Sequence, residues 1–231
     1  MLSLHRIRRH LDDAQPQRLW ADLAKSGLAW PLPLRVRLES APVAAWALAL
    51  RRVCELTQGP TALTHQLTER LLHCQQPSGS WCNDAGQDDP LLTALAAAAL
   101  RRRLLQPSTT PDATQQLIHA HAAALASLTA MQSPEDGLFG SPEIGAGSTS
   151  HSGDVGRTPR RVAEACYILF LIAEDAAALK ALRILPLRDA LDDAAPTFDP
   201  TLRDTHDMAN LLLESQATPA ASLTLNPALA A

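Results

Sequence analysis

The residues of this sequence best suited to acid–base chemistry are two adjacent aspartates, Asp88 and Asp89. They stand directly before an apolar segment, 90–105, that begins with Pro90. Carboxylates that face each other across a cleft can serve as general acid and general base. An aspartate before a helix can instead cap the free backbone N–H groups of the first turn. We take Asp88 and Asp89 as the candidate catalytic acids, with capping as the alternative interpretation.

A second group of polar residues lies in the long segment 141–158, which is rich in Gly and Ser. Asp154 of this segment, or Asp136 just before it, would form a carboxylate pair with Asp89. A loop of this length in a helical protein is typical of a functional or a disordered segment. The acids and the histidine of this region show no compact metal-ligand spacing. We therefore predict no metal site, and no residue pattern identifies a cofactor.

The elements that must position these residues are helices. The chain has 231 residues, of which 41 are Ala and 40 are Leu, but only 5 are Val and 6 are Ile. Ala and Leu favour helices, whereas β-branched and aromatic residues fill strands. The length is enough for one sizeable core. The composition therefore predicts an all-α protein.

Charge and the lack of targeting signals narrow the partners and the compartment. The 20 Lys+Arg and 24 Asp+Glu give a formal net charge of -4, which disfavours nucleic acid and anionic lipid as partners. Residues 1–13 contain no apolar core of a secretory signal, and no apolar stretch is long enough for a transmembrane helix. The four cysteines are too few and too scattered for a disulfide framework. We expect a cytoplasmic protein.

Two kinds of helical segment alternate along the chain. The first kind is apolar nearly all round and must be buried on all sides; it covers 42–57, 90–105 and 160–174. The second kind is amphipathic; it covers 4–25, 61–75 and 112–132, with a charged segment at 178–193. The alternation predicts an inner and an outer layer, that is, a helical-hairpin repeat of about four hairpins. A plain helical bundle is the alternative.

The same patterns predict the limits of the domain and the role of several arginines. We place one helical domain at 1–215, with a last helix at 205–215 that is capped by Asp204, and a flexible tail at 216–231. Arginines near helix ends are interpreted as partners of the helix dipole. They are Arg51 and Arg52, late in one buried segment, and the run Arg101, Arg102 and Arg103, interpreted as the solvated end of the next.

The two connections that lead from an amphipathic to a buried segment have similar sequences. The first reads QQPSGSW from Gln75 to Trp81, and the second reads QSPEDGLF from Gln132 to Phe139. Glutamine can bond backbone groups at a helix end, and Gly allows a turn with positive φ. The aromatic ring would pack the loop against its neighbour. Aligned on Gln76, the two loops are 56 residues apart.

This pattern resembles the QW repeat, Gln-x(2–5)-Gly-x-Trp/Phe, of the terpenoid cyclase and protein prenyltransferase superfamily. The run from Asp89 to Leu95, DPLLTAL, is similar to the family's Asp-x-x-x-Thr-Ala start of an inner helix. The resemblance covers roughly residues 60–175. It implies an α/α-toroid, in which an inner and an outer ring of helices surround a central cavity. About four hairpins imply a partial or small toroid.

The catalytic motifs of the family carry over only in part. Aligned on Thr93 and Ala94, the acidic motif of squalene-hopene-type cyclases puts Leu91 where the proton donor stands. The chain contains neither the Asp-x-Cys zinc motif of protein prenyltransferases nor the Asp-Asp-x-x-Asp helix of metal-dependent cyclases. The sequence therefore leaves open whether the protein is an enzyme.

Three functions stay open. The first is a toroid protein that binds an apolar ligand, for example an isoprenoid, in a central concavity. Its candidate ligand-binding residues are Trp46, Trp81, Leu95, Asp136, Phe139, Tyr167 and Phe170. The second is a non-catalytic module for a protein partner or a second copy of this chain, since a partial ring exposes its inner helices. The third is a carbohydrate-active toroid enzyme that works through paired carboxylates.

Overall fold

The computed structural model describes residues 3–13, 15–24, 41–107, 110–140 and 159–217. Within these ranges the chain forms helices and turns, with nothing more strand-like than isolated bridges, so the prediction of an all-α protein is confirmed. None of the described helices combines the length and the apolar character that crossing a bilayer requires. The helices are α1 (Leu4–Asp12), α2 (Pro16–Ala24), α4 (Pro42–Leu56), α5 (Ala62–His73), α6 (Pro90–Leu104), α7 (Pro111–Met131), α8 (Pro159–Ile172), α9 (Ala176–Ala181), α10 (Ile184–Ala194), a 3₁₀ turn (Ala195–Thr197) and α11 (Pro200–Ala217).

Small polar side chains mark the beginnings of three central helices. Thr61, Asp89 and Thr110 each accept a hydrogen bond from the backbone N–H three residues further on, at the starts of α5, α6 and α7. Pro90 and Pro111 occupy the first helical positions, where a backbone N–H is not needed. These caps satisfy donors that the first turn leaves free, so local residues determine where the three helices begin.

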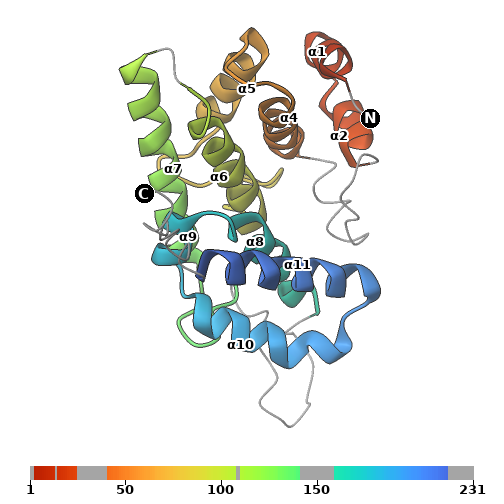
Figure 1. The fold of residues 1–231 in the computed structure, drawn as a ribbon, viewed down its shortest axis with the longest axis vertical. Helices are drawn as coiled ribbons and strands as arrows, with labels where there is room; N and C mark the ends of the chain where they lie inside the picture. Colours follow the sequence, from red (N-terminus) through yellow and green to blue (C-terminus); the bar gives the residue numbers. More distant parts are fainter. Residues whose placement is uncertain (1–2, 14, 25–40, 108–109, 141–158, 218–231) are drawn as a thin grey trace, which may run out of the picture.

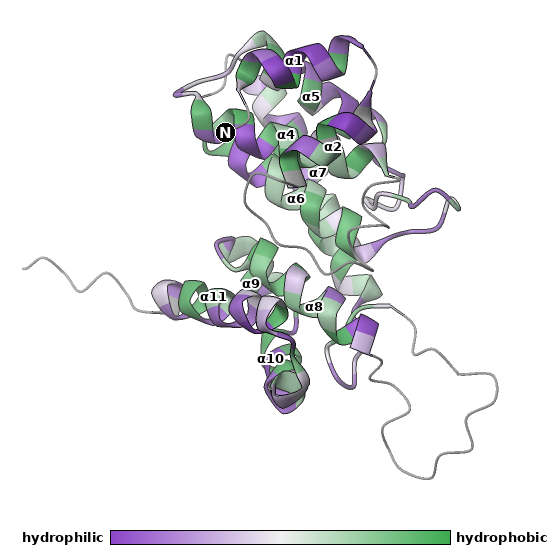
Figure 2. Ribbon diagram, turned by 90° about the vertical axis from the view of Figure 1, so that its right-hand side faces the viewer, coloured by the Kyte–Doolittle hydropathy of each residue, from purple (hydrophilic) through white to green (hydrophobic). Residues whose placement is uncertain are grey.

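Burial alternates between neighbouring helices. In α6 every residue from Pro90 to Leu100 is buried, and more than half of α4 and α8 is buried. In α5 and α7 only one face is buried. The helix α6 packs against α4, α5, α7 and α8 (Figure 1). Apolar residues accordingly run along α6, whereas α1 shows many hydrophilic residues (Figure 2).

The buried helices α4, α6 and α8 run in the same direction. Gln106, just after α6, donates from Nε2 to the carbonyl oxygens of Cys54 and Thr57 at the end of α4. Arg102, in the last turn of α6, pairs with Glu174, just after α8. These bonds join the carboxyl ends of the three helices, a region that we name the C-terminal pole. On either side, α2 packs against α4 and α11 packs against α8.

Two of the predicted helical segments are each broken into two helices. Segment 4–25 contains α1 and α2, and α2 begins at Pro16. The proline ring fixes φ and removes the N–H that a continuous helix would use. Segment 178–193 overlaps α9 and α10, which are separated by Leu182 and Arg183.

The last helix begins earlier and ends later than predicted. It starts at Pro200, because Asp199 Oδ1 accepts from the backbone N–H of Leu202, the capping role predicted for Asp204. Proline in the first helical position favours this start. The helix continues to Ala217 and so enters the predicted tail. The rest of that tail lies outside the described residues.

Candidate functional site

The side chain of Gln75 holds the first loop in place. Its Nε2 donates to the carbonyl oxygen of Gly79 within the loop, at 2.9 Å, and to that of Ala120 in α7, at 2.8 Å. Gly79 has a φ of +86°, and a Cβ atom there would lie 2.3 Å from the carbonyl oxygen of Ala123. The glycine is therefore required both by its backbone conformation and by the closeness of α7.

The second loop repeats this construction with Gln132. Its Nε2 donates to the carbonyl oxygen of Gly137, at 2.7 Å, and to that of Arg183 at the start of α10, at 3.1 Å. Its Oε1 accepts from the backbone N–H of Arg183 at 2.8 Å. Gly137 has a φ of +68°, and a Cβ atom there would lie 2.7 Å from the backbone nitrogen of Leu187. Each loop is thus tied by a glutamine to the half-buried helix that follows.

The two loops also place equivalent aromatic rings in the core. Trp81 and Phe139 each follow the glycine by two residues, and they are 0% and 2% exposed. Trp81 donates from Nε1 to the carbonyl oxygen of Leu71 in α5, at 2.9 Å. The rings fill space between the helices, so both predicted ligand-binding residues are part of the packed core.

This equivalence corrects the alignment of the two loops. Gln76 is exposed, and its backbone N–H bonds the carbonyl oxygen of Ser80. The side chain that makes the bonds of Gln132 belongs to Gln75. Sequence spacing could not distinguish the two glutamines, because the repeat pattern allows a variable number of residues between Gln and Gly.

The two candidate catalytic acids lie in different environments. Asp89 is fully buried at the cap of α6, where its backbone N–H donates to the carbonyl oxygen of Trp81 and its own carbonyl oxygen accepts from Thr93 Oγ1. Asp88 is exposed and accepts from Ser80 Oγ at 2.5 Å. Asp89 therefore has the capping role given above as the alternative, and Asp88 is the acid that reaches solvent.

Asp136 connects the second loop to α8. Its carboxylate lies 3.2 Å from Arg161 Nη1 and accepts from the backbone N–H of Leu138 at 3.0 Å. Arg161 Nε also donates to the carbonyl oxygen of Phe139 at 3.0 Å. Burial raises the pKa of Asp136, but hydrogen bonds from Leu138 and Ser133 and the charge of Arg161 outweigh burial and lower it. At neutral pH the carboxylate of Asp136 is therefore ionised, and its bonds to Leu138 and Arg161 hold the second loop against α8.

The inner-helix residues predicted to line a cavity face different neighbours. The ring centroid of Trp46 lies 5.6 Å from the guanidinium carbon of Arg70 in α5. Tyr167 is hydrogen-bonded to α11, and burial raises its pKa to about 12. Leu95 is fully buried within α6, and Phe170 is partly buried against the core. The contacts of Trp46 and Tyr167 thus belong to two separate helix interfaces.

Part of the predicted site lies outside the described residues. This is the case for segment 141–158 with His151 and Asp154, so their pairing with Asp89 stays a prediction. Across the ranges that are described, no three side chains of His, Cys, Asp or Glu gather closely enough to hold a metal ion.

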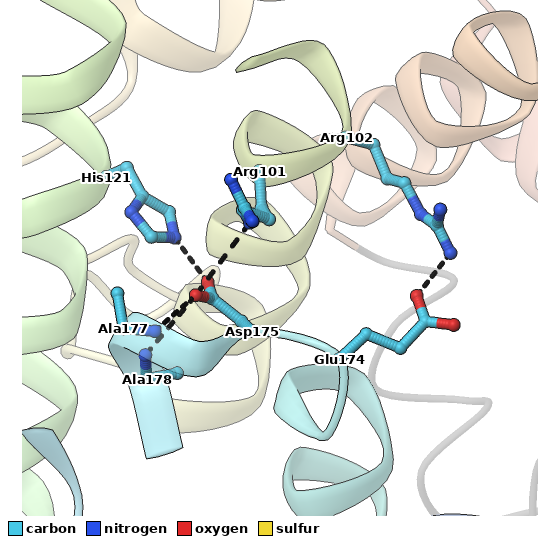
Figure 3. A network of polar contacts seen from close by, with 7 residues as sticks. All are labelled: Arg101, Arg102, His121, Glu174, Asp175, Ala177 and Ala178. Carbon is cyan, nitrogen blue, oxygen red and sulfur yellow. Dashed lines mark hydrogen bonds and ion pairs between the residues drawn. The ribbon is translucent and has the colours of Figure 1, made fainter. Parts of the chain in front are cut away.

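A network of charged side chains that the sequence did not predict lies at the C-terminal pole (Figure 3). At its centre, Asp175 Oδ2 lies 2.7 Å from His121 Nε2 of α7. The other carboxylate oxygen accepts from the backbone N–H groups of Ala177 and Ala178 at the start of α9. Arg101 Nε lies 3.9 Å from the same oxygen. The network joins α6, α7 and the turn after α8.

Two adjoining hollows open beside this network. The first, of about 30 Å³, has an apolar wall formed by Ala97 and Ala98 of α6 and Leu171 and Ile172 of α8. Its charged lining residues include Arg51 and Arg101. The second hollow is wider, about 240 Å³, and lies at the ends of α4 and α6. Arg102 and Leu105 line both hollows, so the two lie side by side, and we name them together the pole cleft.

The arginines of the pole are more deeply buried than the sequence suggests. Arg103 is 2% exposed, so the predicted solvated run is wrong at this residue, because α6 stays covered to its last turn. Arg51 lies before the last turn of α4, so the helix dipole does not account for its position. Among the described residues, Arg51 Nη1, Arg101 Nε, and Nε and Nη1 of Arg103 are buried without a hydrogen-bond partner.

No family model, curated protein or solved structure matches this chain significantly. The resemblance to terpenoid cyclases and protein prenyltransferases therefore rests on the residues and geometry of the two loops and stays a prediction. The pole cleft was missed because its charged residues are far apart in sequence. One signal was present: Arg51 and Arg52 interrupt an otherwise apolar segment before its last turn.

Proposed function

We propose that this chain is a helical-hairpin repeat protein of the α/α-toroid type, with loops of the QW kind. The equivalent bonds of Gln75 and Gln132 support this proposal, since each side chain ties its loop to the next half-buried helix. The common direction of α4, α6 and α8 also supports it, because stacked hairpins bring equivalent helices side by side in parallel. About four hairpins would make a partial or small toroid.

The proposed activity is the binding of an apolar ligand, of the isoprenoid kind, in the pole cleft. The observation that carries it is a hollow with an apolar wall of Ala97, Ala98, Leu171 and Ile172, beside a wider hollow of about 240 Å³ that has room for the rest of a ligand. Small-molecule sites are concave and mostly apolar, with a few polar groups that orient the ligand. The alanines of α6 supply the space, because larger side chains at these positions would fill it.

The position of the candidate acids favours binding over catalysis. Asp88 and Asp89 stand before the first residue of α6, whereas the cleft lies at the last turns of the same helix. The 15 residues of α6 span about 22 Å at 1.5 Å per residue. A general acid must come within hydrogen-bond distance of the reacting atom. We therefore assign these two residues no catalytic role toward a ligand in the cleft.

The proposal is tested by titrating the protein with geraniol, a neutral isoprenoid alcohol, in a calorimeter. Ala98 is 8% exposed and lines the cleft, so Ala98→Leu is expected to fill the space and weaken binding at least about tenfold. Ala126→Leu on the exposed face of α7 adds the same atoms elsewhere and is expected to leave the affinity unchanged. Equal affinity in Ala98→Leu and the unmodified protein would overturn the proposal.

A second candidate function is a protein-interaction module, and the outer face of α11 favours it. Met208 and Leu211 are three residues apart on this helix and are 49% and 60% exposed. An exposed apolar face on the last helix of a stack suits a partner protein or a second copy of this chain. Light scattering tests the second copy: dimers that dissociate in Leu211→Glu would support this function, and monomers at high concentration would count against self-association.

A further inference from the structure

The first hollow of the pole cleft holds more positive charge than its own carboxylates engage. Three arginines and two carboxylates, Glu174 and Asp175, line it. Glu174 pairs with Arg102. Asp175 accepts from the first turn of α9 and lies against a histidine of α7, while Arg101 approaches it only to 3.9 Å. The guanidinium groups of Arg51 and Arg101 are thus left with donors to offer.

Arg51 is the more unusual of the two arginines. Its Nη1 is buried and has no hydrogen-bond partner in the described part of the chain. Burial lowers the pKa of Arg51, an effect that the nearby charges of Glu55 and Glu174 offset in part. A buried donor that is left unpaired destabilises the fold. An anionic group beside Arg51 would remove this penalty and neutralise the charge.

The size and walls of the hollow limit what could bind there. A volume of about 30 Å³ exceeds the roughly 10–15 Å³ that one water needs, so the space admits a small polyatomic group. Arginine forks match the oxygen geometry of carboxylates and phosphates. Arg51 and Arg101 come from different helices and therefore approach from two sides. A tetrahedral phosphate has oxygens for both, whereas a carboxylate offers two oxygens in one plane.

We infer that Arg51 and Arg101 form a binding site for a phosphate group in the first hollow of the pole cleft, between α4, α6 and α8. This inference deepens the proposed function and rests on it, since the phosphate would be the polar end of the ligand. The apolar body of the ligand then passes Leu105, which both hollows share, and extends toward the wider hollow. Arg102 stands between the two hollows and stays paired with Glu174.

The site is tested first with inorganic phosphate alone, by thermal unfolding against sodium chloride of equal ionic strength. A ligand at ten times its Kd is expected to raise Tm by about 3–6 °C in a chain of this size. Arg51→Met and Arg101→Gln are each expected to remove this increase. Arg160→Met, which loses one exposed charge at the other end of α8, is the matched control and keeps it. No stabilisation beyond that of chloride, or equal stabilisation in Arg51→Met, would overturn the site.

The Arg51→Met variant also separates binding from folding. Because it replaces a half-buried guanidinium, whose buried Nη1 has no hydrogen-bond partner, with an apolar chain of similar length, we expect it to be at least as stable as the unmodified protein in phosphate-free buffer. A variant that is folded and stable but insensitive to phosphate supports the site. A variant that has lost stability in phosphate-free buffer shows instead that Arg51 is structural, and overturns it.

Octyl phosphate and geraniol distinguish the phosphate site from the apolar cleft. The two ideas together predict that octyl phosphate binds at least about tenfold more tightly than inorganic phosphate and that Ala98→Leu removes this gain. Phosphate binding with no gain from the octyl chain would leave the phosphate site standing and refute the apolar cleft. Geraniol binding without phosphate binding would leave the apolar cleft standing and refute the phosphate site.

Discussion

Gln75 Nε2 lies 2.8 Å from the carbonyl oxygen of Ala120, 45 residues further along the chain. Gln132 Nε2 likewise lies 3.1 Å from the carbonyl oxygen of Arg183, 51 residues further along the chain. Each bond fixes a loop against the half-buried helix that follows, so the position of that helix depends on one amide group as well as on helix packing. The two glutamines are therefore the residues at which the proposed repeat can be tested directly.

Replacing either glutamine is expected to destabilise the fold. Gln132→Ala should lower the free energy of unfolding by about 3 kcal/mol, since three hydrogen bonds are lost and two carbonyl oxygens lose a donor. Gln75→Ala should cost about 2 kcal/mol, because its two bonds are less buried. Urea unfolding measures both. The exposed Gln76 is the control, and a loss of similar size in Gln76→Ala would contradict the assignment.

Alanine in place of the loop glycines should be more damaging still. Gly79→Ala and Gly137→Ala are each expected to cost about 3 kcal/mol or more, since a positive φ is combined with a clash against the next helix. Gly86 has a φ of +73° but open space around it, so Gly86→Ala isolates the cost of φ alone, about 1–2 kcal/mol. Gly59→Ala, with neither constraint, should be nearly neutral. The four unfolding curves together separate the cost of a positive φ from the cost of a clash with the next helix. Equal costs at Gly79 and Gly86 would show that the closeness of α7 does not constrain Gly79.

Much of the fold follows from patterns that are local in sequence. The apolar residues of 90–100 give α6 no polar face, which predicts its burial on all sides. In the structure every residue from Pro90 to Leu100 is buried. Thr61 and Thr110 cap the starts of α5 and α7, a role that the residue type favours through local chemistry alone. The loop pattern predicted that an aromatic ring packs each loop against its neighbour, and the rings of Trp81 and Phe139 are buried.

The candidate site depends on contacts that no local pattern contains. Asp175 lies 54 residues from His121, and Glu174 lies 72 residues from Arg102. Each of these residues taken alone has an ordinary explanation, such as a helix cap, a helix end or a surface charge. Only the parallel arrangement of the buried helices α4, α6 and α8, with α7 packed against α6, brings them to one pole. For the same reason, spacing could not show that Arg51 lies beside the acids that follow α8.

Stability should fall in acid through Asp175. Burial raises its pKa, but the hydrogen bond and charge of His121 and the N–H groups of Ala178 and Ala177 outweigh burial, so the folded pKa lies below the ordinary 3.8. A lowered folded pKa gives stability that is present above the unfolded value and is lost as pH falls through the folded one. Asp175→Asn should therefore cost about 2 kcal/mol at pH 7, and this difference should shrink at pH 3.

Urea unfolding at the two pH values tests this dependence. Asp84, an exposed aspartate between the first loop and α6, is the control, and Asp84→Asn should match the unmodified protein at both pH values. If the difference between Asp175→Asn and the unmodified protein is as large at pH 3 as at pH 7, the ionised carboxylate of Asp175 is not the source of the stability.

Thiol reactivity should report the burial of α4 and α8, which contain Cys54 and Cys166. Burial raises the pKa of Cys166 to about 12 and that of Cys54 to about 11, against an ordinary value of 9.0. Because the thiolate is the species that is alkylated, iodoacetamide at pH 8 should modify Cys166 about a thousandfold and Cys54 about a hundredfold more slowly than in urea. Peptide mass spectrometry over time measures each rate.

Cys166 Sγ faces the carbonyl oxygen of Leu202 in α11, so its alkylation requires α11 to separate from α8. Labelling of Cys166 as fast as that of the more exposed Cys82 would show that this contact is open in the folded protein.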